Sequence, residues 1–327
     1  MCNEITWDEL LEEYFLARRL KAISEQSYRK VVKGFVDYLD EGVPPARISH
    51  QQVLRWRRHL LNDKKRSSQT WNNKMAHLRA LYNHALEHEL LPAGKNPFNQ
   101  CNVPRDKKKK KTLTRTQMLK IYLLMEQCEE AEGKGQGQRG GRNALYPAWY
   151  WLTVLDMLRY TGIRFNQLLH IRLRDVNLLE GYLDLCLEGS KTRREWRVPI
   201  VTVLKSRLQR LMAQAESVGA TANDFLFDVD RVVLNQQVEW DVEHARQKVR
   251  SFFNRLSKMC GFEVSPHRFR HTLATDLMKS PDRNLQLVKN LLGHCCVSTT
   301  MEYVELDMKI VGKTLESELA IYTDKKR

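Results

Sequence analysis

Two histidines and an arginine stand close together in the stretch SPHRFRHTLATDLM, residues 265–278. The serine that opens it is suited to cap a helix, and the proline after it to occupy the first turn. His267, Arg270 and His271 then fall at positions i, i+3 and i+4, so a helix would place them on one face near its start. Cationic and donor groups at the partly positive end of a helix are typical of an anion site.

A second group of reactive side chains lies in LLGHCCVSTTMEY, residues 291–303. The glycine suits the end of one helix, and Thr299 with Glu302 has the spacing of a capping box that begins the next. We therefore expect His294 just beyond the first helix and Tyr303 in the first turns of the second. A tyrosine placed there is a candidate nucleophile, although a lone tyrosine on a helix is usually core or surface.

The same side chains have a competing interpretation as a zinc site. His267 and His271 have helical i, i+4 spacing, and His294, Cys295 and Cys296 follow downstream. The glutamate of an HEXXH motif is absent, and arginines beside a metal cation are unfavourable. We therefore expect no metal, and we interpret the two cysteines as filling small apolar space after the helix.

Two further cationic side chains lie upstream. The motif TGIR places Arg164 two residues after a glycine that suits the C-terminal turn of the helical pattern PAWYWLTVLDMLRYTG. In GYLDLCLEGSKTRREWRVPI, residues 181–200, apolar and polar residues alternate on both sides of a polar turn. This pattern predicts a β-hairpin with Lys191 at its tip.

The N-terminal part is predicted to be helical. Residues 6–91 contain four stretches with helical spacing of apolar residues, and the first begins with a capping box of Thr6 and Glu9. Basic residues interleave with aromatic ones here, and we expect a group of them to face DNA. A solvated bundle surface is the alternative for each one taken singly. These candidate DNA-binding residues are Arg55, Arg57, Arg58, Lys74 and Arg79.

A basic linker separates this part from the rest. Residues 96–117 carry two prolines, which end helices, and a lysine run, which extends the chain by charge repulsion. We predict a helical domain over residues 1–103, a linker over 104–116 and a second domain over 117–327. The Gly-rich stretch 132–143 lacks the order of a phosphate-binding loop and is predicted to be a plain loop. The lysines of the run, which would also suit DNA phosphates, are Lys107, Lys108, Lys109, Lys110 and Lys111.

The composition points to a polyanionic partner. The 54 Lys and Arg against 39 Asp and Glu leave a formal charge of +15, which favours nucleic acid because bound counterions are released. Seven scattered cysteines without a CxxC pair are typical of reduced thiols. The apolar runs are too short for a membrane and the N-terminus is unlike a signal peptide, so we expect a soluble cytoplasmic protein.

Taken together, these motifs resemble the C-terminal signature of the tyrosine recombinases, or phage-type integrases. HRFRH, LLGH and Tyr303 match its last part, and TGIR resembles the upstream arginine box. Lys191 lies eight residues before Pro199, similar to the position of the family's catalytic lysine. The resemblance implies a mainly α fold, with a helical, SAM-like core-binding domain and an α-rich catalytic domain that contains a small β-hairpin or sheet.

The resemblance also implies a reaction. Tyr303 would attack a DNA phosphodiester and form a covalent 3′-phosphotyrosyl link, without metal, ATP or another cofactor. His267 would accept the tyrosine proton, and Lys191 would protonate the 5′-oxygen that leaves. A hydroxyl of another strand would reverse the step and so exchange strands.

Charge on the phosphate would be balanced by the other motif residues. Arg164 and Arg270 would form paired, charge-assisted hydrogen bonds with the phosphoryl oxygens, and His294 would add one more. His271 is expected to give structural support or a phosphate contact. Gln167 stands where the family usually has a carboxylate, and would support Arg164 by hydrogen bonding without offsetting its charge.

By the same resemblance, the partners are double-stranded DNA and three further copies of the chain, in a homotetramer on two DNA sites, with accessory DNA-bending proteins. We expect an integrase of a mobile element in a bacterial cytoplasm, on the nucleoid when bound to DNA. A regulator with the same fold that binds DNA without cutting it is the alternative. The amphipathic tail, residues 308–322, is expected to pack on its own domain or on a neighbouring copy.

Overall fold

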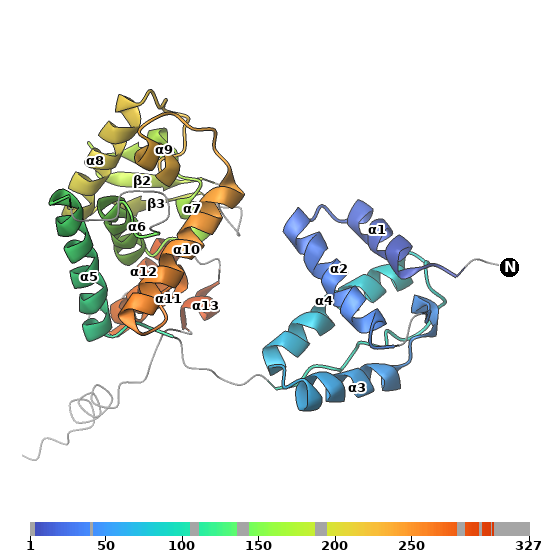
Figure 1. Cartoon of the computed structure of the whole chain (residues 1–327). Coiled ribbons are helices and arrows are strands. Elements are labelled where there is room, and N and C mark those ends of the chain that lie inside the picture. Colours follow the sequence, from blue (N-terminus) through green and yellow to red (C-terminus); the bar gives the residue numbers. More distant parts are fainter. Residues whose placement is uncertain are drawn as a thin grey trace, which may run out of the picture. The chain divides into compact units, whose positions relative to one another are not determined.

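The chain folds into two compact units, Met1–Lys109 and Lys110–Arg327, and each has its own hydrophobic core (Figure 1). No helix in the described part of the chain is both long and apolar enough to cross a membrane. The computed structural model describes residues 4–39, 42–104, 111–135, 144–186, 195–279, 285–293, 296–301 and 303.

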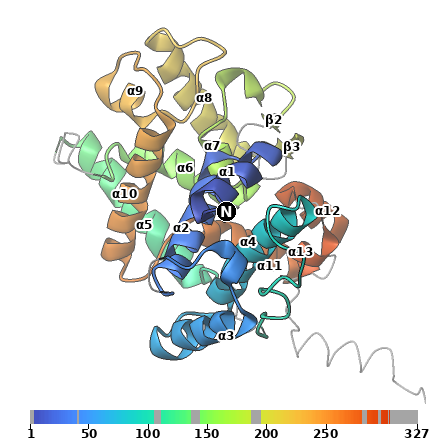
Figure 2. The same cartoon turned by 90° about the vertical axis from the view of Figure 1, so that its right-hand side faces the viewer.

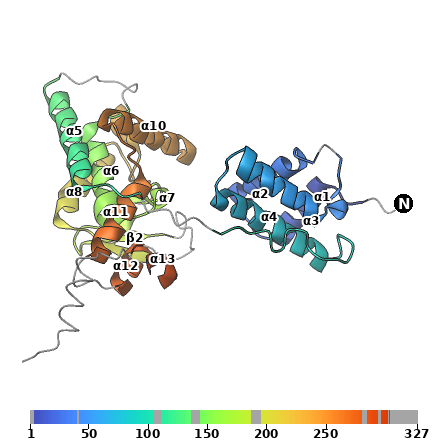
Figure 3. The same ribbon diagram turned by 90° about the horizontal axis from the view of Figure 1, so that it is seen from below.

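The N-terminal unit is a bundle of helices, as predicted (Figure 3). The capping box is confirmed, because the Glu9 N–H donates to the Thr6 hydroxyl and the Thr6 N–H donates to the Glu9 carboxylate. The helices are α1 (Trp7–Ala17), α2 (Ala22–Val36), a 3₁₀ turn (Pro45–Arg47), α3 (His50–Arg58), its π-helical extension (His59–Asp63) and α4 (Ser68–Glu87).

Aromatic rings fill the centre of this bundle. The ring centroids of Phe35 and Trp56 are 4.8 Å apart, and those of Trp56 and Trp71 are 5.4 Å apart. Such pairs add attraction to the area they bury. The Trp71 indole N–H donates to the carbonyl oxygen of Cys101 at 2.7 Å, so the chain that follows α4 is tied back to the bundle.

The C-terminal unit is α-rich (Figure 2). Helix α6 is buried on nearly all sides, and α5, α8 and α11 pack around it. Helices α8 and α9 lie at one end of the unit, and α11, α12 and α13 at the other (Figure 1). The helices are α5 (Arg115–Gly133), α6 (Ala148–Thr161), α7 (Phe165–Leu168), α8 (Thr202–Ser217), α9 (Val229–Leu234), α10 (Val242–Cys260), α11 (Pro266–Lys279), α12 (Leu285–Leu292) and α13 (Val297–Met301).

One small antiparallel sheet has the order β1 (Val176–Asn177), β2 (Tyr182–Leu185) and β3 (Trp196–Pro199), and a 3₁₀ turn precedes it. Strands β2 and β3 pair with Leu185 opposite Trp196, so the predicted hairpin is confirmed. The sequence did not predict β1, because two residues are too few for an alternating pattern. The hairpin tip with Lys191 lies outside the described residues.

Helix α6 ends where α11 and α12 also meet. Gly162 follows it with φ of +61°, a left-handed conformation that glycine adopts without strain. A Cβ atom here would lie 2.8 Å from Cδ2 of Leu273 in α11 and 3.0 Å from Cδ2 of Leu292 in α12. The turn that carries the chain to Arg164 is therefore built against the two helices that bear the other motifs.

The substitution Gly162→Ala should destabilise the C-terminal unit by about 1–3 kcal/mol, because backbone strain adds to overlap with two leucines. Gly261 is a matched control, with φ of +76° after α10 and no described atom within 4 Å of its Cβ position. Urea unfolding followed by tryptophan fluorescence would compare Gly162→Ala with Gly261→Ala. Equal losses would contradict a packing role for Gly162.

Candidate active site

The first two turns of α11 carry three of the predicted site residues. The helix begins at Pro266 as predicted, and the Ser265 carbonyl accepts the N–H of Arg268 at 3.0 Å. His267, Arg270 and His271 follow within five residues. The rings of the two histidines have centroids 6.4 Å apart and an interplanar angle of 27°, so they lie roughly parallel along one side of the helix.

Arg270 is the buried cation of the site, with 5% of its surface exposed. Its Nη1 donates to the carbonyl oxygen of Gly162 at 2.6 Å, and its Nη2 donates to that of Leu292 at 2.7 Å. Burial and then repulsion from Arg164 lower the pKa of Arg270 to about 10, against attraction from Tyr303. The guanidinium therefore stays charged at neutral pH while it joins the ends of α6 and α12.

Arg164 directly precedes α7 and is half-buried. Its main-chain N–H donates to Oε1 of Gln167 at 3.1 Å. Gln167 is 2% exposed, and no hydrogen-bond partner reaches its Nε2 in the part of the chain that the structure describes. The neutral glutamine thus caps the turn that holds Arg164, but it places no negative charge beside the arginine.

His267 lies on the exposed side of α11. Partial withdrawal of its ring from water lowers its pKa first, and the positive charges of Arg270 and Arg164 lower it further. The two guanidiniums therefore lie near this ring as well as near each other. Three basic groups that disfavour one another's charge form a site that an anion would stabilise.

Tyr303 is packed into the same site. It is 4% exposed and belongs to a small apolar cluster with Ala274 and Met278 of α11 and with Val288 and Leu292 of α12. Its hydroxyl oxygen lies 2.9 Å from Nδ1 of His271, a contact that no local sequence pattern predicts. The spacing of HRFRH brings two histidines to one face, and it does not tell which one the tyrosine meets.

The predicted start of the last helix is wrong. Helix α13 begins at Val297, two residues before Thr299, because the Cys296 carbonyl already accepts the Thr299 N–H at 3.3 Å. Tyr303 follows this helix instead of lying in its first turns, and its N–H donates to the Thr300 carbonyl at 3.0 Å. Glu302, the other half of the predicted capping box, lies outside the described residues.

The apolar-filler interpretation is also wrong for Cys296, whose side chain is exposed. Its Sγ lies 3.0 Å from the Ser298 hydroxyl, and this contact lowers the pKa of the thiol. Within the described ranges, no group of three His, Cys, Asp or Glu side chains is placed to hold a metal ion. His294 and Cys295 lie outside those ranges.

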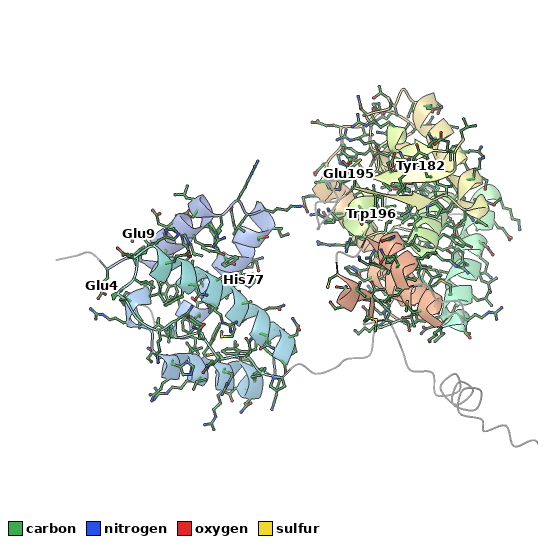
Figure 4. All side chains as sticks on the ribbon, turned by 180° about the vertical axis from the view of Figure 1, so that it is seen from behind. Glu4, Glu9, His77, Tyr182, Glu195 and Trp196 are labelled. Carbon is green, nitrogen blue, oxygen red and sulfur yellow. The ribbon has the colours of Figure 1, made fainter. Side chains whose placement is uncertain are left out.

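Trp196 connects the hairpin to the end of α12. It begins strand β3, on the return from the segment that contains Lys191 (Figure 4). Gly293, with φ of +59°, lies against its ring so closely that a Cβ atom would be 2.5 Å from Cζ2. No described group accepts a hydrogen bond from the buried indole Nε1. The strand that leads from Lys191 therefore contacts the residue next to His294 in the chain.

The candidate DNA-binding residues of the N-terminal unit differ in their surroundings. Arg55 and Arg58 are exposed and Arg57 is half-buried. The Lys74 ammonium lies 5.5 Å from the Trp56 ring centroid, and burial, followed by repulsion from Arg66, lowers its pKa. In the linker, Lys107–Lys110 lie outside the described residues, and Lys111 pairs with Glu263 at 3.4 Å.

Arg79 instead supports the loop that follows α4. Its Nε and Nη2 donate to the Phe98 carbonyl at 3.3 Å, and Nη2 also donates to Oδ1 of Asn102 at 3.0 Å. These hydrogen bonds hold the chain against the bundle, whatever else the guanidinium contacts. The sequence pattern did not distinguish this arginine from its exposed neighbours.

The substitution Arg79→Ala should therefore destabilise the N-terminal unit by about 1–2 kcal/mol, because it leaves two acceptors without their donor. Arg55→Ala removes an exposed charge and should change stability by less than about 0.5 kcal/mol. Thermal unfolding of both full-length variants measures the difference. Equal stability of the two would show that the loop does not depend on Arg79.

Known families match both units of the chain. The phage integrase family matches residues 141–309, and the phage integrase N-terminal SAM-like domain matches residues 8–91. The chain is 35% identical to a putative tyrosine recombinase XerC of Pseudomonas aeruginosa and 33% identical to one of Pseudomonas syringae. These similarities cover 93% and 95% of the chain, which spans 69% and 64% of the relatives' own lengths.

Solved structures have the same fold. The Tn1549 transposon integrase in complex with transposon right-end DNA is similar with a TM-score of 0.71 and 16% identity, over 97% of this chain and 100% of that one. A lambda integrase tetramer bound to a Holliday junction is similar with a TM-score of 0.64 and 18% identity, over 93% and 78%. The predicted mainly α, two-domain fold is confirmed. The chain belongs to the phage integrase family of tyrosine recombinases.

Proposed function

We propose that this chain is a site-specific DNA recombinase that cuts and rejoins strands through a covalent 3′-phosphotyrosyl intermediate, with no metal ion or nucleotide. One observation carries the proposal. The Tyr303 hydroxyl, hydrogen-bonded to His271, is buried in the same site as the guanidinium of Arg270. A phenol held among basic groups is suited to attack a phosphodiester.

In this proposal Arg164 and Arg270 neutralise the charge that builds up on the phosphoryl oxygens. Burial lowers the pKa of Arg270 and repulsion from Arg164 lowers it further, and a phosphate between the two guanidiniums would relieve this repulsion. His267 and His294 would add hydrogen bonds to the same oxygens. Gln167 would hold the main chain at Arg164 in place. It would not form the ion pair with the guanidinium that a carboxylate would form, so the guanidinium stays available to the phosphate.

The proposed cleavage step forms one bond to phosphorus and breaks one. The Tyr303 oxygen attacks phosphorus and loses its proton to a neighbouring base, while the bond from phosphorus to the 5′-oxygen breaks. Lys191 would give that oxygen a proton, so a free 5′-hydroxyl leaves. The phosphotyrosyl bond is similar in energy to the bond broken, and a 5′-hydroxyl from another strand reverses the step.

The partners follow from this chemistry. The substrate would be double-stranded DNA, held by the basic N-terminal unit through residues such as Arg55 and Arg58 and by the linker lysines. We propose a homotetramer on two sites, by analogy with the lambda integrase tetramer on a Holliday junction. DNA of a mobile element in a bacterial cytoplasm is the proposed target, by analogy with the transposon integrase bound to transposon right-end DNA.

A nicked suicide substrate that carries the recombination site tests the proposal. In EDTA, the wild-type chain should form a covalent protein–DNA adduct, and Tyr303→Phe should form none while it still binds the site in a gel-shift assay. Wild-type protein that binds the site without forming an adduct would point to a non-cutting regulator with this fold.

The role of Lys191 has its own test. Lys191→Ala should slow cleavage about 100-fold or more, because the 5′-oxygen would leave without its acid. A substrate with sulfur at the 5′-bridging position needs no acid and should restore the rate. If the sulfur substrate remains as slow as the oxygen substrate, Lys191 is not the acid.

A further inference from the structure

We infer that His271, and not His267, takes the proton of Tyr303 during cleavage and returns it during rejoining. This inference rests on the proposed function, since it names the base for the same nucleophile. A general base must lie within hydrogen-bond reach of the proton it removes, about 2.6–3.2 Å between heavy atoms. Nδ1 of His271 lies 2.9 Å from the Tyr303 oxygen, with the ring centroids 5.5 Å apart.

The contact is fixed from both sides. His271 follows Arg270 in α11, and the Arg270 guanidinium ties that helix to Gly162 and Leu292. Tyr303 packs on the same helix, at Ala274 among others, and is almost fully buried. One helix therefore holds both the phenol and the imidazole, so their distance does not depend on a long flexible side chain.

His267 is placed for a different task. It lies one helical turn before His271, and its side chain is exposed where that of His271 is half-buried. Burial lowers its pKa first, and the nearby charges of Arg270 and Arg164, which would receive the phosphate, lower it further. An imidazole on that side is suited to donate a hydrogen bond to a phosphoryl oxygen. In this proposal His271 transfers the proton of Tyr303, and His267 binds the phosphate.

The proton balance is simple. Neutral His271, with its hydrogen on Nε2, has a lone pair on Nδ1 that faces the Tyr303 hydroxyl. As the tyrosine oxygen bonds to phosphorus, its proton passes to Nδ1 and gives an imidazolium, while Lys191 protonates the leaving 5′-oxygen. In rejoining, the attacking 5′-hydroxyl returns its proton to Lys191, and Nδ1 returns its proton to the tyrosine oxygen.

The test replaces Tyr303 with a tyrosine analogue whose phenol is more acidic. An ordinary tyrosine has a pKa of about 10, so it needs a base near neutral pH. A ring-fluorinated tyrosine at position 303 ionises more readily and needs less help. We would measure single-turnover adduct formation with tyrosine or fluorotyrosine at this position, in wild-type, His271→Ala and His267→Ala chains.

With ordinary tyrosine, His271→Ala should slow adduct formation about 100-fold or more. Fluorination should raise the rate of adduct formation by His271→Ala at least about tenfold. It should raise the rate of His267→Ala much less, because the group missing there is a phosphate contact. His271→Asn keeps a hydrogen-bonding group near the Nδ1 position but accepts no proton. It should behave as His271→Ala does, and its unfolding midpoint would report whether the fold is intact.

The inference fails if His271→Asn cleaves at the wild-type rate, or if fluorination helps His267→Ala as much as His271→Ala. Both outcomes differ from failure of the proposed function, in which the wild-type chain itself forms no adduct on a site that it binds.

Discussion

The guanidinium of Arg270 joins the C-terminal ends of two helices. The carbonyl groups at a helix C-terminus carry partial negative charge, and a cation placed against them is stabilised. Arg270 meets Gly162 directly after α6 and Leu292 at the end of α12. The chain leaves the first point toward Arg164 and the second toward His294. A single buried cation therefore holds together the two points from which the chain continues to Arg164 and to His294.

Among the described residues, this arrangement gathers positive charge at the site. Gln167 satisfies the main chain at Arg164 with a neutral amide, where a carboxylate would also form an ion pair. The charges of Arg164, Arg270 and His267 then oppose one another, and this repulsion adds to burial in lowering the pKa of Arg270 and of His267. A DNA phosphate would offset these positive charges. Such a site attracts its substrate with groups that are already in position, and little has to reorganise during the reaction.

The sequence predicted what local patterns determine. Apolar periodicity located the N-terminal helices, alternation located the β2–β3 hairpin, and Pro266 marked the start of α11. The order of the motifs along the chain indicated which residues could form the active site. Contacts between residues far apart in the chain produce no such local sequence pattern. Nothing near Arg79 in the chain indicates that it supports the Phe98 carbonyl, 19 residues away, and nothing in HRFRH indicates which imidazole Tyr303 meets. The capping rule misplaced the start of α13 for a similar reason, because a main-chain carbonyl had already begun the turn.

The contact between Trp196 and Gly293 limits how such an enzyme can be altered. A side chain larger than hydrogen at position 293 and an indole at position 196 exclude each other. A larger side chain at position 293 would therefore need a smaller one at position 196. Replacing the hairpin with that of a related recombinase would leave a cavity or a steric clash between position 196 and Gly293, unless the new residue at position 196 is also tryptophan. The β2–β3 hairpin is thus not an exchangeable module, and its boundary for protein design includes Gly293, which follows α12.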